Sequence, residues 1–260
     1  MTPSEQPAAG LFRGPPAYVP RTPWTPTLAV LATVVIVSAS IVGAVLMLGA
    51  GTVADAPSGL PGRGRWGSGS GEATALLTLG LWQAMVVVLT IVASAMFGGS
   101  PRDVLALRPA GSGRVYLLAL LMMVAMQATV SAVQHSVIAN DVFADLRPMV
   151  KLLGGETWLL ALVVVGIGAP LSEELLFRGF LLSALARTRL GFAGAAVVTS
   201  GAWTAMHAGY SAAGIVEVFL IGLLFSWMLW RTGSLRVALF CHALYNSLIV
   251  LVLRHVPLPG

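Results

Sequence analysis

Residues 157–187 read TWLLALVVVGIGAPLSEELLFRGFLLSALAR, an apolar segment long enough to cross a bilayer that carries charges at its centre. Glu173, Glu174 and Arg178 fall within six residues of one another. A charge at that depth costs at least about 2.5–3.5 kcal/mol on insertion scales, so three together require a structural or chemical reason. Backbone groups in hydrocarbon must be paired internally, and no alternating strand pattern occurs, so the segment is predicted to be helical.

The rest of the chain is similarly apolar. Hydrophobic residues make up 57% and charged residues 10%, and mean hydropathy is +0.88, whereas soluble domains are about 25% charged. A soluble fold is excluded, and we predict an all-α polytopic membrane protein with about seven transmembrane helices, or eight if segment 157–187 is broken at Pro170. The predicted segments are 27–51, 73–97, 115–134, 157–187, 190–207, 212–230 and 235–253.

Three regions differ in composition. Residues 1–26 hold seven of the 15 prolines and no sustained apolar run, which predicts a disordered, Pro-rich cytoplasmic tail. Residues 27–156 supply three transmembrane helices with connecting loops, and residues 140–151 are predicted to form a short helix in the membrane interface. Residues 157–254 contain the polar motifs and form the predicted catalytic transmembrane core.

The distribution of basic residues predicts orientation. Nine Lys and Arg residues lie on the side of the amino terminus and five on the other, which favours a cytoplasmic amino terminus in a multi-pass protein of the cell membrane. The basic residues are scattered between apolar stretches, so the net charge of +5 does not indicate a nucleic-acid partner. The lipid bilayer is the predicted surrounding, and the sole cysteine, Cys241, excludes a disulfide framework.

The two adjacent glutamates differ in their local partners. Glu174 and Arg178 are spaced i,i+4 with the acid first, the better orientation for an ion pair. Glu173 points about 100° away on the helical wheel and has no local partner. Pro170 is predicted to kink or break the helix, which would make Ser172 an N-cap and place both acids in a first helical turn.

Two further segments carry polar residues at helical spacing. His207 follows Trp203 by one turn, and His242 and Asn246 are spaced i,i+4 on one face of the last helix. Each feature alone fits a buried hydrogen-bonded contact as well as a catalytic group. With a rise of about 1.5 Å per residue, Glu173, His207, His242 and Asn246 lie about 22, 28, 15 and 21 Å from one membrane side. The four residues are therefore predicted to meet near one depth.

The ordered motifs EELLFR (173–178), WTAMH (203–207) and HALYN (242–246) resemble those of the CAAX prenyl protease and bacteriocin-processing family (CPBP, Abi) of intramembrane proteases. The resemblance covers about residues 157–254. The family pattern is Glu-Glu-x-x-x-Arg, then Phe-x-x-x-His, then His-x-x-x-Asn or Asp. The chain departs from it at Trp203, which stands in the Phe slot and affects the expected shape of the pocket.

The resemblance implies an intramembrane endopeptidase that hydrolyses peptide bonds of membrane-associated proteins, lipidated ones included. It implies that Glu173 and His207 activate a water, while His242 and Asn246 donate hydrogen bonds to the tetrahedral oxygen. Glu174 and Arg178 would orient the site from behind.

Metal dependence stays open at this point. Glu173, His207 and His242 with a water are a plausible zinc set, which fits the name metalloprotease that the family often carries, and a glutamate-activated water without metal fits the same residues. Glu217, near the outer end of its segment, is predicted to reach the interface. The alternative functions are a non-catalytic membrane immunity or scaffold protein of the same architecture, or a proton-coupled transporter that uses the buried carboxylates.

Overall fold

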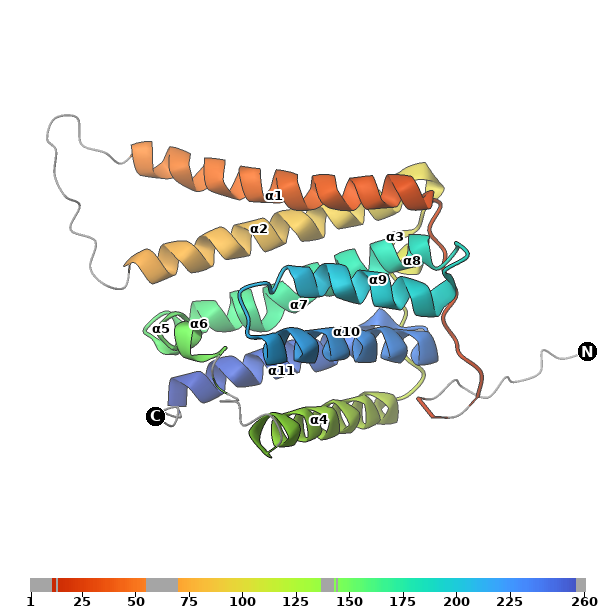
Figure 1. Ribbon diagram of the computed structural model, residues 1–260. Coiled ribbons are helices and arrows are strands. Elements are labelled where there is room, and N and C mark those ends of the chain that lie inside the picture. Colours follow the sequence, from red (N-terminus) through yellow and green to blue (C-terminus); the bar gives the residue numbers. More distant parts are fainter. Residues whose placement is uncertain (1–10, 13, 55–69, 137–142, 144, 256–260) are drawn as a thin grey trace, which may run out of the picture.

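The computed structural model describes residues 11, 12, 14–54, 70–136, 143 and 145–255. Helices and turns form this part of the chain, and it contains no strand (Figure 1). The predicted all-α fold is confirmed. The amino-terminal helices are α1 (Pro26–Ala54), α2 (Ser70–Ala95), the 3₁₀ turn η1 (Met96–Gly98), α3 (Pro101–Val104) and α4 (Gly113–Ser136).

The second half of the chain forms a short cap and the central helices. The cap consists of the 3₁₀ turn η2 (Arg147–Met149) and α5 (Val150–Gly154). A continuous helix then contains α6 (Trp158–Ala161), the π-helical η3 (Leu162–Gly168), α7 (Ala169–Glu173), the π-helical η4 (Glu174–Leu181) and α8 (Leu182–Leu185). It is followed by α9 (Gly191–Ala205), α10 (Ala212–Thr232) and α11 (Leu235–His255).

Six helices among the described residues are long and apolar enough to cross a membrane: 26–47, 71–98, 113–136, 158–185, 212–232 and 235–255. Six of the seven predicted segments correspond to them. The remaining segment, 190–207, is the apolar helix α9, which has only 15 residues and rises about 22 Å, less than the hydrocarbon thickness of about 30 Å.

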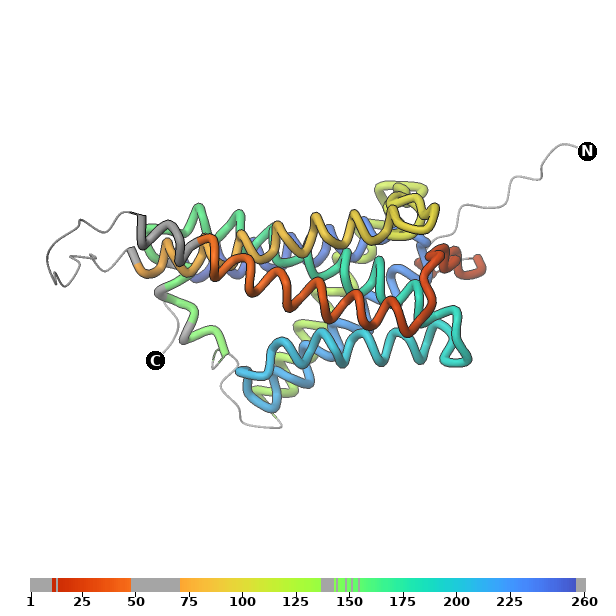
Figure 2. The backbone as a smooth tube through the Cα atoms, turned by 90° about the horizontal axis from the view of Figure 1, so that it is seen from above, coloured from red at the N-terminus to blue at the C-terminus, as the bar shows by residue number. Residues whose placement is uncertain are grey.

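The long helices run broadly along one direction (Figure 2). Helix α1 packs on α2, α9 packs on α10, and α11 packs along η3, while α4 lies at the far edge against α10 and α11. Helix 158–185 contacts both α9 and α11, so the three elements that carry the sequence motifs pack together.

The predicted break at Pro170 is wrong, and so is the eight-helix alternative that depends on it. The backbone donor of Ala169 bonds the carbonyl of Val164, five residues back, which closes a wide π turn just before the proline. This wider turn makes room for the proline ring and needs no donor from it. Ser172 is not an N-cap, because its hydroxyl donates to the carbonyl of Ala169 at 3.0 Å inside the continuous helix.

The amino-terminal segment also differs from the predicted disordered tail. Residues 14–25 follow a defined path, and the amides of Ala17 and Tyr18 both donate to the carbonyl of Trp230, each at 3.2 Å. Trp24 is 9% exposed and donates to the carbonyl of Ala93 at 2.9 Å. Backbone hydrogen bonds and one buried indole thus hold this segment on the bundle, which composition alone does not reveal. Residues 1–10 and 13 lie outside the described residues.

The predicted interface helix at 140–151 is only partly within the described residues, because 137–142 and 144 lie outside them. The described part is helical from Arg147 to Gly154, a shorter helical segment that begins later than predicted. Helix α5 packs against α11, so this short helix is part of the helical bundle.

Candidate active site

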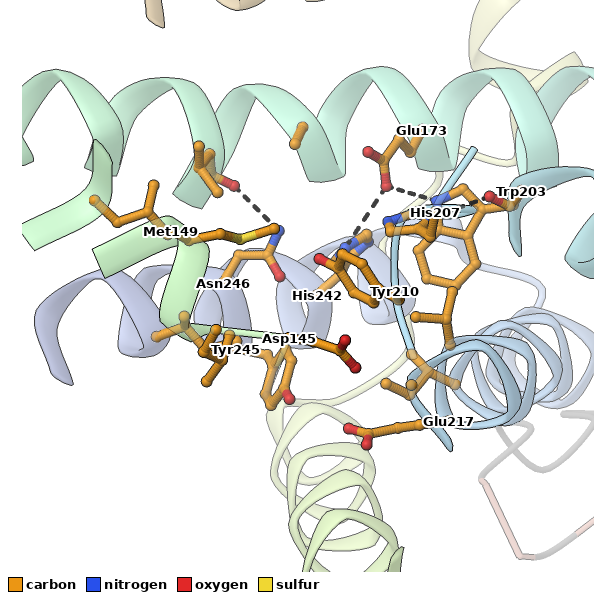
Figure 3. Close-up of a pocket in the computed structure, with 18 of the residues that line it drawn as sticks. Asp145, Met149, Glu173, Trp203, His207, Tyr210, Glu217, His242, Tyr245 and Asn246 are labelled. Atoms are coloured by element: carbon orange, nitrogen blue, oxygen red, sulfur yellow. Dashed lines mark hydrogen bonds and ion pairs between the residues drawn. The ribbon is translucent and has the colours of Figure 1, made fainter. Parts of the chain in front are cut away.

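A cavity of about 580 Å³ lies between the cap, helix 158–185, α10 and α11. Glu173, His207, His242 and Asn246 all line it (Figure 3). The sequence-based depth argument is thus consistent with the structure, which brings all four residues to one cavity.

Burial separates the two adjacent glutamates. The side chain of Glu173 is 13% exposed and reaches the cavity wall, whereas that of Glu174 is fully buried, at 0%. Only Glu173 is therefore placed to contact a bound molecule. The difference follows from the helix, which turns adjacent side chains about 100° apart.

Glu174 lies at the centre of a buried cluster of ionisable side chains. Its Oε1 accepts a hydrogen bond from Arg178 Nη1 at 3.2 Å, with both side chains fully buried, which confirms the predicted i,i+4 pair. The same oxygen lies 3.0 Å from His242 Nδ1. Gly222 of α10 provides the space, because a Cβ there would lie 2.9 Å from Arg178 Nη2.

Glu173 has partners from two other helices. Its Oε2 accepts a hydrogen bond from Trp203 Nε1 at 2.6 Å and lies 3.8 Å from His242 Nε2. The sequence correctly predicted that this residue has no local partner. Its actual partners lie 30 and 69 residues away along the chain, so only the tertiary fold identifies them.

The ring of His207 is oriented by its own helix end. Its Nδ1 lies 3.1 Å from the carbonyl of Trp203, and its ring centroid is 5.1 Å from that of Trp203. A carbonyl only accepts hydrogen bonds, so Nδ1 carries the proton in this contact and Nε2 of the neutral ring keeps a free lone pair. Within the described residues no hydrogen bond or ion pair joins His207 to Glu173.

Asn246 faces the same cavity one turn beyond His242. Its Nδ2 donates to the carbonyl of Val165 at 3.1 Å, a carbonyl inside the π-helical segment η3. An amide nitrogen has two hydrogens, so one donor remains for another acceptor. This contact fixes the side chain on the wall formed by helix 158–185.

Glu217 makes its hydrogen bonds inside the bundle, and its predicted position near the membrane interface stays a prediction. Its two carboxylate oxygens accept hydrogen bonds at 2.7 Å from Gln127 Nε2 and from Gln134 Nε2, both on α4. Gln127 Nε2 also donates to the Tyr245 hydroxyl at 2.8 Å. Figure 3 shows Glu217 on the opposite side of the cavity from Glu173. Gln127 and Gln134 are seven residues apart in an otherwise apolar helix, and this spacing was the sequence signal that could have identified the partners of Glu217.

Asp145 is a second polar group that sequence reasoning missed. Its two oxygens accept hydrogen bonds from Ser211 N at 2.7 Å and from Ser211 Oγ at 2.8 Å. Gly214 leaves the necessary space, because a Cβ there would meet Asp145 Oδ2 at 2.1 Å. This contact ties the segment just before the cap to the start of α10, and Asp145 lines the cavity.

The residues of the predicted metal set do not assemble. Among the described residues, no group of three or more His, Cys, Asp or Glu side chains is placed to hold a metal ion. Nδ1 of His207 and Nδ1 of His242 are engaged by a carbonyl and a carboxylate, which leaves Nε2 of each ring to face the cavity. In the described part of the chain Glu173, His207 and His242 are thus not grouped as one ligand set, and metal dependence stays a prediction that chelation can test.

The fold and the cavity define a class: an all-α polytopic membrane protein with a carboxylate and two imidazoles on the wall of an embedded cavity. Residues 155–248 match the family model described as type II CAAX prenyl endopeptidase Rce1-like. The predicted resemblance is confirmed over this region, which contains every predicted site residue. The match covers just over a third of the chain. No curated protein and no solved structure matches the chain at a significant level.

Proposed function

We propose that this protein is an intramembrane endopeptidase that hydrolyses a peptide bond with a water activated by Glu173 and His207. The observation that carries the proposal is the placement of the Glu173 carboxylate on the wall of a cavity that the imidazoles of His207 and His242 also line, in a helix long and apolar enough to span a membrane. The Rce1-like match over residues 155–248 supports the same reaction class.

Water activation requires a group that accepts a proton close to the attacking oxygen. Glu173 supplies a carboxylate, and Nε2 of His207 supplies a lone pair because its Nδ1 is committed to the Trp203 carbonyl. The attacking water gives its proton to this pair, and the proton then passes to the amine that leaves. The peptide carbonyl carbon gains the hydroxyl oxygen, so the products are a carboxylic acid and an amine.

The tetrahedral oxygen needs hydrogen-bond donors on the other side of the bond. His242 and Asn246 take this role in the proposal. His242 donates its Nδ1–H to Glu174 Oε1, so it takes this role as an imidazolium, whose second N–H, at Nε2, points toward Glu173 and the cavity. Asn246 contributes the amide hydrogen that Val165 does not use. Glu174, which is paired with Arg178, holds the His242 ring in this orientation without contacting the substrate.

The substrate class follows from the cavity and its surroundings. Apolar side chains of α2, the cap and α11 line one part of it, including Leu79, Met149, Leu153 and Ile249. An apolar or lipidated segment of a membrane-associated protein fits this wall, since its burial there replaces lipid contacts. The protein would act as a multi-pass enzyme of the cell membrane, on a protein or peptide partner and without nucleic acid.

We also propose that the amino terminus is cytoplasmic. The start of α1 and the ends of α8 and α10 lie at one side of the bundle, whereas α5 and the end of α11 lie at the opposite side (Figure 1). Arg21, Arg187 and Arg231 are close in sequence to, or within, those first three helix ends. The excess of basic residues on the first side favours the cytoplasm.

A direct test uses the purified protein in nanodiscs and a quenched fluorogenic peptide that ends in a farnesylated CAAX sequence. Removal of the base by Glu173→Gln should lower kcat about 10²–10⁴-fold. The matched control is Glu156→Gln, which changes an exposed acid outside the cavity and should leave kcat intact. Full turnover by the Glu173→Gln protein would refute the proposed role.

The same variants discriminate the alternative, a non-catalytic immunity or scaffold protein. If the cellular phenotype survives Glu173→Gln but is lost on changes to the exposed loops, the protein binds a partner and does not cleave one. A processed protein that is present in membranes with the wild type and absent with Glu173→Gln would instead identify the substrate.

A further inference from the structure

Trp203 occupies the slot where the family motif has Phe, and the structure shows what the larger side chain adds. Its indole Nε1 donates to Glu173 Oε2 at 2.6 Å, a hydrogen bond that a Phe ring cannot make. We infer that the Trp203 N–H is a positioning donor, which anchors the carboxylate of Glu173 at the cavity wall. This inference rests on the proposed role of Glu173 as the base.

The anchor matters because Glu173 has a competing partner. His242 Nε2 lies 3.8 Å from the same oxygen that the indole holds. A glutamate side chain is flexible, and a free carboxylate would move toward the imidazole and close the gap between them. The indole hydrogen bond opposes that movement, so both Glu173 and His242 stay available to the reacting groups.

Trp203 itself is held firmly enough to act as an anchor. The side chain is 3% exposed, and the guanidinium carbon of Arg178 lies 4.3 Å from its ring centroid. The ring of His242 is 5.6 Å away and that of Phe225 is 6.5 Å away. A Phe ring would keep most of these packing contacts, so Trp203→Phe removes little except the N–H donor.

The test compares two Trp→Phe variants with the same fluorogenic farnesylated peptide. Trp203→Phe should lower kcat about 10- to 100-fold, the range for one hydrogen bond to a charged group, with KM changed less than about twofold. Trp24→Phe is the matched control, because it removes another buried indole hydrogen bond, to the Ala93 carbonyl at 2.9 Å, outside the residues that line the cavity. It should leave kcat within about twofold of wild type.

A second measurement is independent of turnover. With nitrogen-15-labelled tryptophan, the protein gives indole N–H signals from its seven tryptophans, and the signal of Trp203 is the one missing in Trp203→Phe. A short hydrogen bond to a carboxylate should move its proton downfield, and Glu173→Ala should move it back upfield.

Two results would overturn the inference: a kcat for Trp203→Phe equal to that of wild type, or a Trp203 indole signal that Glu173→Ala does not shift. If the wild-type protein fails to cleave the peptide, the proposed function is contradicted. The NMR measurement then decides by itself whether Trp203 anchors Glu173.

Discussion

Arg178→Met is the substitution whose cost the structure defines best. It removes the guanidinium that pairs with the fully buried carboxylate of Glu174. Glu174 Oε2 already has no hydrogen-bond partner within the described residues, so His242 would remain as the single contact of the acid. The variant therefore leaves a buried charge with little compensation, while methionine fills much of the volume of the arginine stem.

Removing one partner of a buried ion pair costs about 3–5 kcal/mol. For a chain of this size, each kcal/mol lowers Tm by about 2–4 °C, so Tm should fall by roughly 6–20 °C. Thermal unfolding in detergent, followed by size-exclusion chromatography of the soluble fraction, measures the shift. Arg108→Met is the matched control, since the Arg108–Asp103 pair, at 2.6 Å, is largely exposed, and it should shift Tm far less.

The double variant Glu174→Gln/Arg178→Met separates charge from packing. Glutamine keeps an acceptor for His242 and removes the orphaned charge, so a positive coupling of about 0.5–3 kcal/mol is expected between the two changes. A Tm for Arg178→Met no lower than that of Arg108→Met would refute the reasoning, because it would mean that the carboxylate of Glu174 does not need the guanidinium.

Three further outcomes are expected. Glu217 accepts two hydrogen bonds, from Gln127 and Gln134. In Glu217→Gln the new amide hydrogens face one of those donors, so the free energy of unfolding should fall by about 1–3 kcal/mol in the same assay. An unchanged Tm would contradict this network. Gly214→Ala should displace Asp145 from the start of α10 and raise trypsin cleavage of the cap, whereas equal cleavage of variant and wild type would argue against the close approach. Chelation by 1,10-phenanthroline should leave turnover of the fluorogenic peptide intact, since no three-ligand group is assembled among the described residues; a loss restored by zinc would reverse that expectation.

The sequence by itself determined the class of protein and most of the site. Low charge and long apolar runs leave only a helical membrane protein, because backbone groups in hydrocarbon must be paired within each segment. Spacing along one helix was enough to predict the pair of Glu174 and Arg178, since residues four apart share a face. Counting residues from the connecting loops, at about 1.5 Å of helical rise each, was enough to predict that His207, His242 and Glu173 lie at similar depths in the membrane.

Only the tertiary structure decided what surrounds each of these groups. The partners of Glu173 come from α9 and α11, and those of Glu217 come from α4, at separations that no local pattern encodes. Pro170 was misread because it follows a π turn in η3, a segment that packs against α2 and α11 and whose wider turn no local sequence pattern predicted. Local periodicity specifies which face of a helix is polar, and the packing of helices specifies which polar faces meet.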